Sequence, residues 1–168
     1  MHTVIKFAKI RPTARVPTKR EKGVGYDVYA DFSEDFIVIE PHTTKMIPTG
    51  IASSCDNNYC FIIGGSSDNN LKKASQCLEV ISSEYNDEWL IPITNISDGR
   101  LYIGDVSKAY EYEHRQKDSR LLYLNGIMPT YHPYDKPIAH FLLIPVPTTD
   151  IEEYASEKMK IASSCKEW

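Results

Sequence analysis

The segment YDVYADFSEDFIVIEPHTTKMIPTGIASSCDNNYCFII, residues 26–63, decides the fold of this 168-residue chain. It contains four short runs rich in β-branched and aromatic residues, at 26–30, 36–39, 45–52 and 59–63. Each run is bounded by Pro, Gly, Asn or Asp, which are residues that turns prefer. Short apolar runs separated by such residues predict β-strands, so this segment predicts four consecutive strands.

The same pattern continues on both sides of this segment. Further strands are predicted at 4–10, 78–81, 89–94, 101–103, 121–124 and 138–146. Ten prolines and eight glycines lie mostly between the runs. This regular spacing predicts an all-β sandwich or barrel.

Two stretches depart from the strand pattern. Residues 105–119 are polar and fit either a short helix or a mobile loop, because their tyrosines form no clean helical stripe. Residues 150–161 predict a short C-terminal helix. They offer Asp150 as an N-cap, with glutamates early and lysines late in the segment, which matches the helix dipole.

Composition narrows the class of protein. Apolar residues make up 42% of the chain and charged residues 25%, which fits one globular domain or at most two small ones. The net charge of −4 lacks the uniformly basic footprint of a strong nucleic-acid binder. No run of eighteen apolar residues predicts a membrane helix, and the first seventeen residues contain no signal-peptide core. The four cysteines show no zinc spacing and fit reduced thiols of a cytoplasmic protein.

Several segments, taken in order, resemble the motifs of the trimeric dUTPases (deoxyuridine triphosphate pyrophosphatases). Residues 23–28 (GVGYDV) are similar to the family's AGYDL element, and 47–52 (IPTGIA) to its strand ending in TGIA. Residues 62–67 (IIGGSS) stand where the family has its phosphate loop, and 80–88 (VISSEYNDE) where it has GVIDxxYxGE. Residues 136–140 (KPIAH) stand where it has GDxIAQ. The order and spacing of these segments carry the resemblance over about residues 3–96 and 134–147.

The resemblance implies a homotrimer of β-barrel or jelly-roll subunits that hydrolyses dUTP to dUMP and pyrophosphate with Mg²⁺, at sites between subunits. It implies a domain over residues 1–147, with a long insertion at about 97–134 and a C-terminal helix and tail at 148–168. In the family, a hairpin in the third motif holds uracil, its Tyr packs under the deoxyribose, and its Asp activates the attacking water. A Gly-rich C-terminal arm closes over the nucleotide.

By this resemblance, part of a deoxynucleotide site is retained. Asp27 is present in the first motif, where it offers a weak Mg²⁺ ligand or a catalytic carboxylate. Ile81 and Tyr85 are present in the third motif. Ser66 and Ser67 offer hydroxyl groups, and Gly65 a flexible turn whose N–H groups suit phosphate. Each of these residues also has a purely structural interpretation as a turn, strand-end or packing residue.

The departures from the family motifs concern the chemical step. Ser82 stands where the family has the water-activating Asp, and loss of a general base costs a factor of about 10²–10⁴ in rate. Gly65 stands where the family has a phosphate-binding Arg, and an Arg that stabilises the transition state can be worth about 10³–10⁵. His140 replaces the Gln of the fourth motif, and the C-terminal residues lack the Gly-rich arm. Glu79 or Glu84 is a possible replacement base, Lys72 or Lys73 a replacement cation, and Trp168 a base-stacking residue.

Three hypotheses follow. The first is a dUTPase-fold protein that has lost efficient hydrolysis and acts by binding, as a regulator or as a structural trimer. The second is an active dUTP diphosphatase with a rearranged site that uses Mg²⁺. The third is a sensor that binds a deoxyuridine nucleotide without cleaving it. The resemblance favours a phage or viral origin, hence the host cytoplasm or the virion, and the insertion at 97–134 offers a surface for a protein partner.

Overall fold

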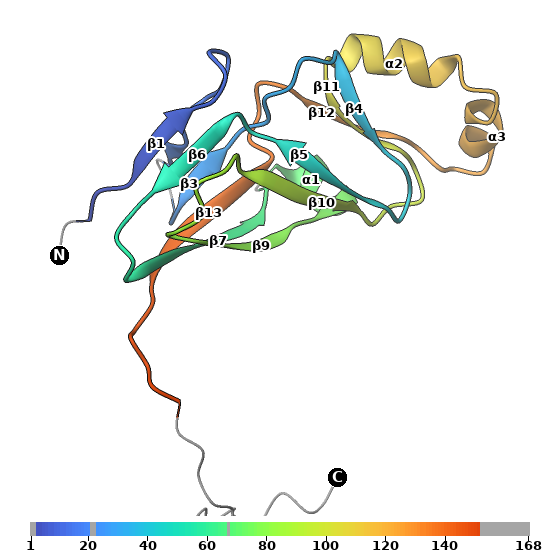
Figure 1. Cartoon of the computed structure of the whole chain (residues 1–168). Helices are drawn as coiled ribbons and strands as arrows, with labels where there is room; N and C mark the ends of the chain where they lie inside the picture. Colours follow the sequence, from blue (N-terminus) through green and yellow to red (C-terminus); the bar gives the residue numbers. More distant parts are fainter. Residues whose placement is uncertain (1–2, 21–22, 67, 152–168) are drawn as a thin grey trace, which may run out of the picture.

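A computed structural model describes residues 3–20, 23–66 and 68–151, and it is mostly β (Figure 1). This confirms the predicted fold class. The strands are β1 (Lys6–Lys9), β2 (Thr18–Lys19), β3 (Tyr26–Val28), β4 (Phe36–Ile39), β5 (Thr44–Pro48), β6 (Ile51–Ser54), β7 (Tyr59–Gly65), β8 (Ser75–Gln76), β9 (Leu78–Ser82), β10 (Leu90–Asn95), β11 (Leu101–Gly104), β12 (Thr130–Pro133) and β13 (Ala139–Pro145). The helices are α1 (Asn69–Ala74), α2 (Val106–His114) and α3 (Ser119–Leu124).

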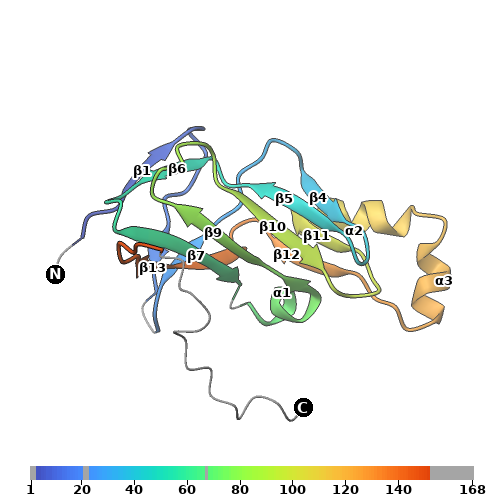
Figure 2. The ribbon, with the colours of Figure 1, turned by 60° about the horizontal axis from the view of Figure 1, so that its bottom comes forward.

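The strands form four small sheets. The largest has the order β2-β3-β13-β7-β9, and the others are β5-β10-β8, β12-β11-β4 and the pair β1-β6. Figure 2 shows β5 and β10 lying over β7 and β9, with the sheet of β4, β11 and β12 to one side. All pairings are antiparallel except that of β11 with β12.

An aromatic cluster joins the sheets in the core. Trp89, which enters β10, is fully buried, and its ring lies 4.9 Å from that of Phe61 on β7 and 5.5 Å from that of Phe141 on β13. Phe7 of β1 packs edge-on against the same Trp89 ring. In β10, alternate residues Ile91 and Ile93 are buried, as expected for a strand with one face on the core. The β-branched runs therefore supply the inward face of each layer.

The prediction of one strand at 45–52 is wrong, because the structure has two strands there, β5 and β6. The chain breaks after Pro48 and resumes at Ile51, because Gly50 turns with a φ of +66°. The Gly50 Cβ position would lie 2.5 Å from the Asp31 carboxylate, so no larger residue fits there. The break lets β5 pair with β10 and β6 with β1, which places consecutive strands in two different sheets.

The predicted strand at 121–124 is also wrong, because these residues end the helix α3. The short run Leu121–Leu124 satisfies either period, and the helix is favoured by its setting after Asp118 and before Gly126, which has a φ of +75°. For residues 105–119, where the sequence fits either a helix or a loop, the structure has the helix α2. Asp105 caps α2 by accepting bonds from the backbone N–H groups of Ser107 and Lys108, at 3.0 and 3.1 Å.

The predicted insertion forms a helical crossover between two parallel strands. The chain leaves β11, passes through α2 and α3, and returns as β12 beside β11, with α2 against this sheet and α3 beyond α2 (Figure 1). The Glu113 carboxylate of α2 is buried and accepts hydrogen bonds from Tyr102, from Ser119 at 2.7 Å and from Arg100 at 3.2 Å. This polar cluster attaches the crossover to the sheet.

The strand β9 lies at the edge of the five-stranded sheet in the part of the chain that the structure describes. Its outward residues are apolar, with Leu78 70% exposed and Val80 59% exposed.

Cys55, Cys60 and Cys77 are free thiols, as predicted. Among the described residues, no helix is long and apolar enough to cross a membrane. The predicted C-terminal helix and tail, with Cys165 and Trp168, lie outside the described residues beyond position 151.

Candidate functional site

Three neighbouring strands place Asp27, His140 and Gly64 in one row across the large sheet. Asp27 on β3 is the register partner of His140 on β13, which is in turn the partner of Gly64 on β7. Register partners in antiparallel strands project to the same face. The next row, Tyr26, Phe141 and Ile63, faces the aromatic core, so the row of Asp27 lies on the outward face of the sheet. We call this the outward row.

His140 fills the space that a side chain at position 64 would occupy. A Cβ on Gly64 would lie 3.2 Å from Cε1 of His140. The His140 Nδ1 atom lies 2.6 Å from the carbonyl oxygen of Gly65, so it donates to that carbonyl. This contact fixes the ring against the turn that follows β7. By contrast, Gly65 pairs with the buried Ala139, so a Cβ there would project to the opposite face of the sheet, where it would meet nothing closer than 4.0 Å.

Asp27 is ion-paired with Arg20. The Arg20 Nε atom lies 2.8 Å from Oδ1 of Asp27, and the two side chains are 18% and 20% exposed. The Arg20 Nη2 atom is buried and has no hydrogen-bond partner among the described residues. Sequence reasoning did not single out Arg20. The only signal was its place before the glycine-containing turn that returns the chain to Asp27.

Ser66 has its hydroxyl group engaged within the turn. It donates to the carbonyl oxygen of Pro137 at 2.8 Å and accepts from the backbone N–H of Asp68 at 3.0 Å. The Asp68 carboxylate lies 3.2 Å from the Lys136 ammonium, and it accepts a bond from the Leu71 N–H in the first turn of α1. Ser66 therefore stabilises the turn that it was expected to offer to phosphate. Ser67, the other predicted phosphate residue, lies outside the described residues.

A second group of predicted residues lies at the far end of β9. Ile81 is buried, and Ser82 and Tyr85 border a pocket of about 380 Å³ that Met46, Glu79, Val80 and Leu90 also line. Residues 82–85 form a turn closed by a bond from the Tyr85 N–H to the Ser82 carbonyl, at 3.2 Å. The Tyr85 hydroxyl donates to the Glu88 carbonyl at 3.1 Å. We call this the hairpin pocket.

Glu88 anchors the hairpin to the rest of the fold. Its carboxylate accepts bonds from the Arg11 guanidinium and from the backbone N–H of Gly50, the latter at 2.7 Å. Arg11 also binds the buried Asp31 at 2.6 Å. Burial acts to raise the pKa of Glu88, but the hydrogen bonds from Arg11 and Gly50 outweigh it, so the pKa lies below its usual value. The carboxylate thus stays charged and holds the turn in place.

The two groups lie apart within one chain. Gly64 pairs with Leu78, whereas Ser82 pairs with Cys60 four residues further along the same strands. At about 3.4 Å per residue this separates the outward row from Ser82 by about 14 Å along the sheet. The structure therefore brings together Asp27, Gly65, Ser66 and His140, and separately Ile81, Ser82 and Tyr85.

Of the replacement groups considered from sequence, Glu79 does not share the face of Ser82. Glu79 lines the hairpin pocket, but strand residues three apart project to opposite faces, so it does not share the face of Ser82. Its carboxylate accepts a bond from the Val80 N–H at 3.2 Å. Glu84 is exposed in the turn, and Lys73 lines a hollow beside Thr130 and Tyr131. The side chain of Lys72 lies outside what the structure describes.

A divalent cation held by protein groups does not fit this donor set. Asp27, the one predicted metal ligand, already faces the Arg20 guanidinium. In residues 3–20, 23–66 and 68–151, no three His, Cys, Asp or Glu side chains are placed to hold a metal ion together. We therefore derive no chemical step through a protein-bound metal.

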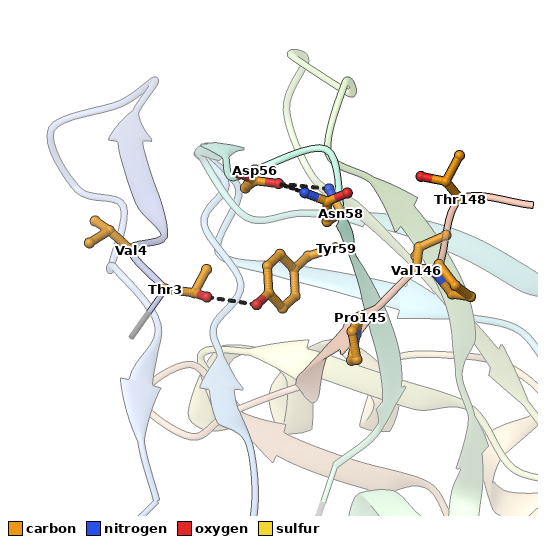
Figure 3. Close-up of a pocket in the computed structure, with 9 residues that line it drawn as sticks. Thr3, Val4, Asp56, Asn58, Tyr59, Pro145, Val146 and Thr148 are labelled. Carbon is orange, nitrogen blue, oxygen red and sulfur yellow. Dashed lines mark hydrogen bonds between the residues drawn. The ribbon is translucent and has the colours of Figure 1, made fainter. Parts of the chain in front are cut away.

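A hollow larger than the hairpin pocket lies elsewhere. It has a volume of about 760 Å³ and lies at the end of β7 and β13 that begins with the Tyr59–Pro145 pair (Figure 3). The Thr3 hydroxyl donates to Tyr59 there, at 2.9 Å. Asp56 is the only charged residue in its lining, so it offers no cation for a phosphate. None of the predicted site residues lines it.

Comparisons with known proteins agree with the motif order. The dUTPase family model matches residues 12–108. A deoxyuridine 5′-triphosphate nucleotidohydrolase of Leptospira interrogans is 30% identical over 99 residues, which are 56% of this chain and 68% of that protein.

Solved structures show the same fold. A variant dUTPase of phage phi11 of S. aureus, whose structure describes the coordination of a structural Mg(II) ion, has a TM-score of 0.61 and 17% identity. It covers 90% of this chain and 96% of its own. A variant of the phage 80alpha dUTPase has a TM-score of 0.65 and 15% identity, over 100% of this chain and 98% of its own.

Proposed function

This chain belongs to the dUTPase family, and on that premise we propose that it binds a deoxyuridine nucleotide and hydrolyses dUTP inefficiently or not at all. The hairpin pocket takes the uracil and sugar, with Tyr85 against the deoxyribose. The outward row takes the phosphates. The protein then acts through the bound state, as a regulator or a structural trimer, and turnover is not its main output.

The observation that carries this proposal is Ser82 at the end of β9. It occupies the family position of the water-activating Asp, at the border of the hairpin pocket. A serine hydroxyl is neutral at pH 7 and accepts a proton poorly, so it does not replace a carboxylate base. The nearest carboxylate along the strand, Glu79, projects to the opposite face. Hydrolysis is therefore expected to be slower by a factor of about 10²–10⁴.

We propose a homotrimer in which neighbouring subunits each supply one group to a site. The outward row and the hairpin pocket lie at different ends of β7 and β9 within one chain. The exposed apolar residues Leu78 and Val80, next to the pocket, favour coverage by another copy. Light scattering tests this, since a monomer at high concentration contradicts a site shared between subunits.

The test of lost hydrolysis is pyrophosphate release from dUTP and Mg²⁺, with a restored base as the probe. Ser82→Asp returns the family carboxylate, and we expect it to raise the rate by tenfold or more, within the range of about 10²–10⁴ typical of a general base. Ser83→Asp adds the same charge one residue away, on the other side of the turn, and should leave the rate at the wild-type level. Brisk wild-type hydrolysis that Asp27→Ala abolishes would contradict the proposal and favour an active enzyme with a rearranged site.

A protein partner is a second candidate, which we propose for the insertion. Its helices expose apolar and aromatic side chains, including Tyr110, Leu121 and Leu124. The crossover is attached rigidly through Glu113, so it presents these side chains in a fixed arrangement. A surface of this kind suits recognition by another protein better than catalysis.

A further inference from the structure

We propose that Arg20 is the phosphate-binding cation of this site, and that it replaces both the arginine missing at position 65 and a protein-held metal ion. This inference rests on the proposed nucleotide binding. Its starting point is the guanidinium of Arg20, which is largely buried. One of its nitrogens is ion-paired and another has no partner among the described residues. Nε binds Asp27 at 2.8 Å, whereas the buried Nη2 has no partner among the described residues.

A buried, unpaired N–H of a charged group is unfavourable. Guanidinium carries five donors, and a buried donor that lacks an acceptor costs about 1–3 kcal/mol. Native structures rarely keep such a group without a purpose, and a bound anion is the natural acceptor for a guanidinium fork. The orphaned nitrogen of Arg20 therefore marks a place where an acceptor is expected.

The position of Arg20 matches the phosphate end of the site. Its partner Asp27 belongs to the outward row. Asp27 on β3 lies beside His140 on β13, and Gly64 lies on β7, the next strand beyond β13. Adjacent strands are about 4.8 Å apart, so Asp27 lies about 10 Å from Gly64 across the sheet. The Arg20 guanidinium reaches Asp27 from the β2 side of the sheet, so it stands at the Asp27 end of the outward row.

Other polar groups at this end are already engaged. The Ser66 hydroxyl donates to Pro137, and the Lys136 ammonium lies 3.2 Å from the Asp68 carboxylate. His140 directs Nδ1 at the carbonyl of Gly65. Arg20 is the charged group at this end whose unpaired donor is buried among the described residues, which is why we assign it the role of the absent arginine.

This arrangement gives Asp27 a new role. In a metal-bridged site the carboxylate attracts the cation that holds the phosphates, so its loss weakens binding. Here the carboxylate orients Arg20, and its own charge opposes the incoming phosphates. Asp27→Asn keeps an oxygen that accepts the Nε–H bond but removes the negative charge. The two mechanisms thus predict opposite effects of the same substitution.

The experiment is calorimetric titration of the full-length protein with the non-hydrolysable analogue α,β-imido-dUTP, in buffer containing EDTA. We expect wild-type binding without metal, and binding about tenfold to hundredfold weaker in Arg20→Gln, as for loss of a hydrogen bond to a charged group. Lys19→Gln, which removes the same charge from the preceding exposed residue, should bind like wild type. Asp27→Asn should bind about twofold to tenfold more tightly, whereas the exposed Asp35→Asn should not change binding.

Deoxyuridine and dUMP serve as probes that distinguish this inference from the proposed function. If deoxyuridine binds but the added phosphates bring no affinity that depends on Arg20, only the role of Arg20 is overturned. If none of the three ligands binds at millimolar concentration, nucleotide binding itself is overturned. A requirement for Mg²⁺, or weaker binding in Asp27→Asn, contradicts the inference directly. Because Asp27→Asn preserves the bond to Arg20, it tests the role of Arg20 even if Arg20→Gln fails to fold.

Discussion

Gly50 shows how much a single residue constrains this fold. It turns with a φ of +66°, and a Cβ there would lie 2.5 Å from Oδ2 of Asp31 and 2.7 Å from the Cβ of Ala14. Asp31 is itself held by Arg11, which also reaches Glu88 in the hairpin. A side chain at position 50 would therefore disturb the ion pairs that support the hairpin pocket.

Replacing Gly50 by Ala should destabilise the protein more than replacing Gly126 does. Both glycines have positive φ, of +66° and +75°, so both substitutions carry backbone strain of about 1–3 kcal/mol. Gly126 has open space around its Cβ position, whereas the Cβ position of Gly50 is crowded by the Asp31 carboxylate, which Arg11 holds. Urea unfolding of the two variants measures the difference. Equal losses of unfolding free energy would show that the crowding around Gly50 relaxes at no cost.

Single residues also show what sequence reasoning reached and what it missed. Asp27 and Tyr85 can be identified from sequence because their neighbouring residues match the family motifs. The structure places Asp27 on the outward face of the sheet and Tyr85 at the border of the hairpin pocket. Arg20 carries no such mark. Its importance comes from a contact made across the turn between β2 and β3, and from a nitrogen left without an acceptor, and neither is visible in the order of residues.

At the level of elements, the helical crossover depends on one buried carboxylate. Glu113 is 2% exposed in its side chain and is bound by Arg100, Tyr102 and Ser119. Burial acts to raise the pKa of Glu113, but the hydrogen bonds from Ser119, Tyr102 and Arg100 outweigh it, so the pKa lies below the usual value. The same carboxylate and burial raise the pKa of the Tyr102 hydroxyl.

Glu113→Gln should lower the free energy of unfolding by about 3–5 kcal/mol at pH 7, the usual cost of removing one partner of a buried ion pair. Because the folded pKa of Glu113 is depressed, its stabilising effect is present above the ordinary value of 4.5 and is lost as pH falls through the folded pKa. The stability gap between wild type and variant should therefore narrow in acid. Glu111→Gln is the control on the same helix. Its exposed bond to Arg115 should contribute no more than about 0.5 kcal/mol.

The elements that sequence patterns predicted badly are short or ambiguous. Residues 121–124 have four apolar or aromatic side chains in a row, which fit a strand as well as one turn of helix. The strands β2 and β8 contain two residues each, too few for a periodic signal. The strand β12 pairs in parallel with β11 across the whole crossover, so nothing local identifies it. The runs at 59–63 and 138–146 were predicted well because each buries alternate residues, Phe61 and Ile63 in the first and Ala139 and Phe141 in the second. The run at 36–39 buries Ile39, and its apolar residues between turn residues identify it.

At the level of the whole molecule, the separation of the two residue groups permits a test of a shared site. Tyr85→Ala damages the hairpin pocket, and Arg20→Gln damages the phosphate end. If each site draws one group from each of two subunits, refolding a 1:1 mixture of the variants should restore about a quarter of the binding sites. Calorimetry with α,β-imido-dUTP counts these sites. A mixture that binds no better than its components would show that both groups act within one chain.

The apolar edge formed by Leu78 and Val80 has a consequence for how the protein is made. An exposed edge strand with unpaired backbone groups can pair with strands of other chains, and charged side chains on the edge normally prevent this. In β9 the residue between Leu78 and Val80 is Glu79, which projects to the opposite face and so does not protect the exposed face. A newly synthesised chain would thus expose this apolar strand edge until another subunit covers it. Slow expression at low temperature should accordingly give more soluble protein than rapid expression, because exposed strand edges aggregate more as the concentration of unassembled chains rises.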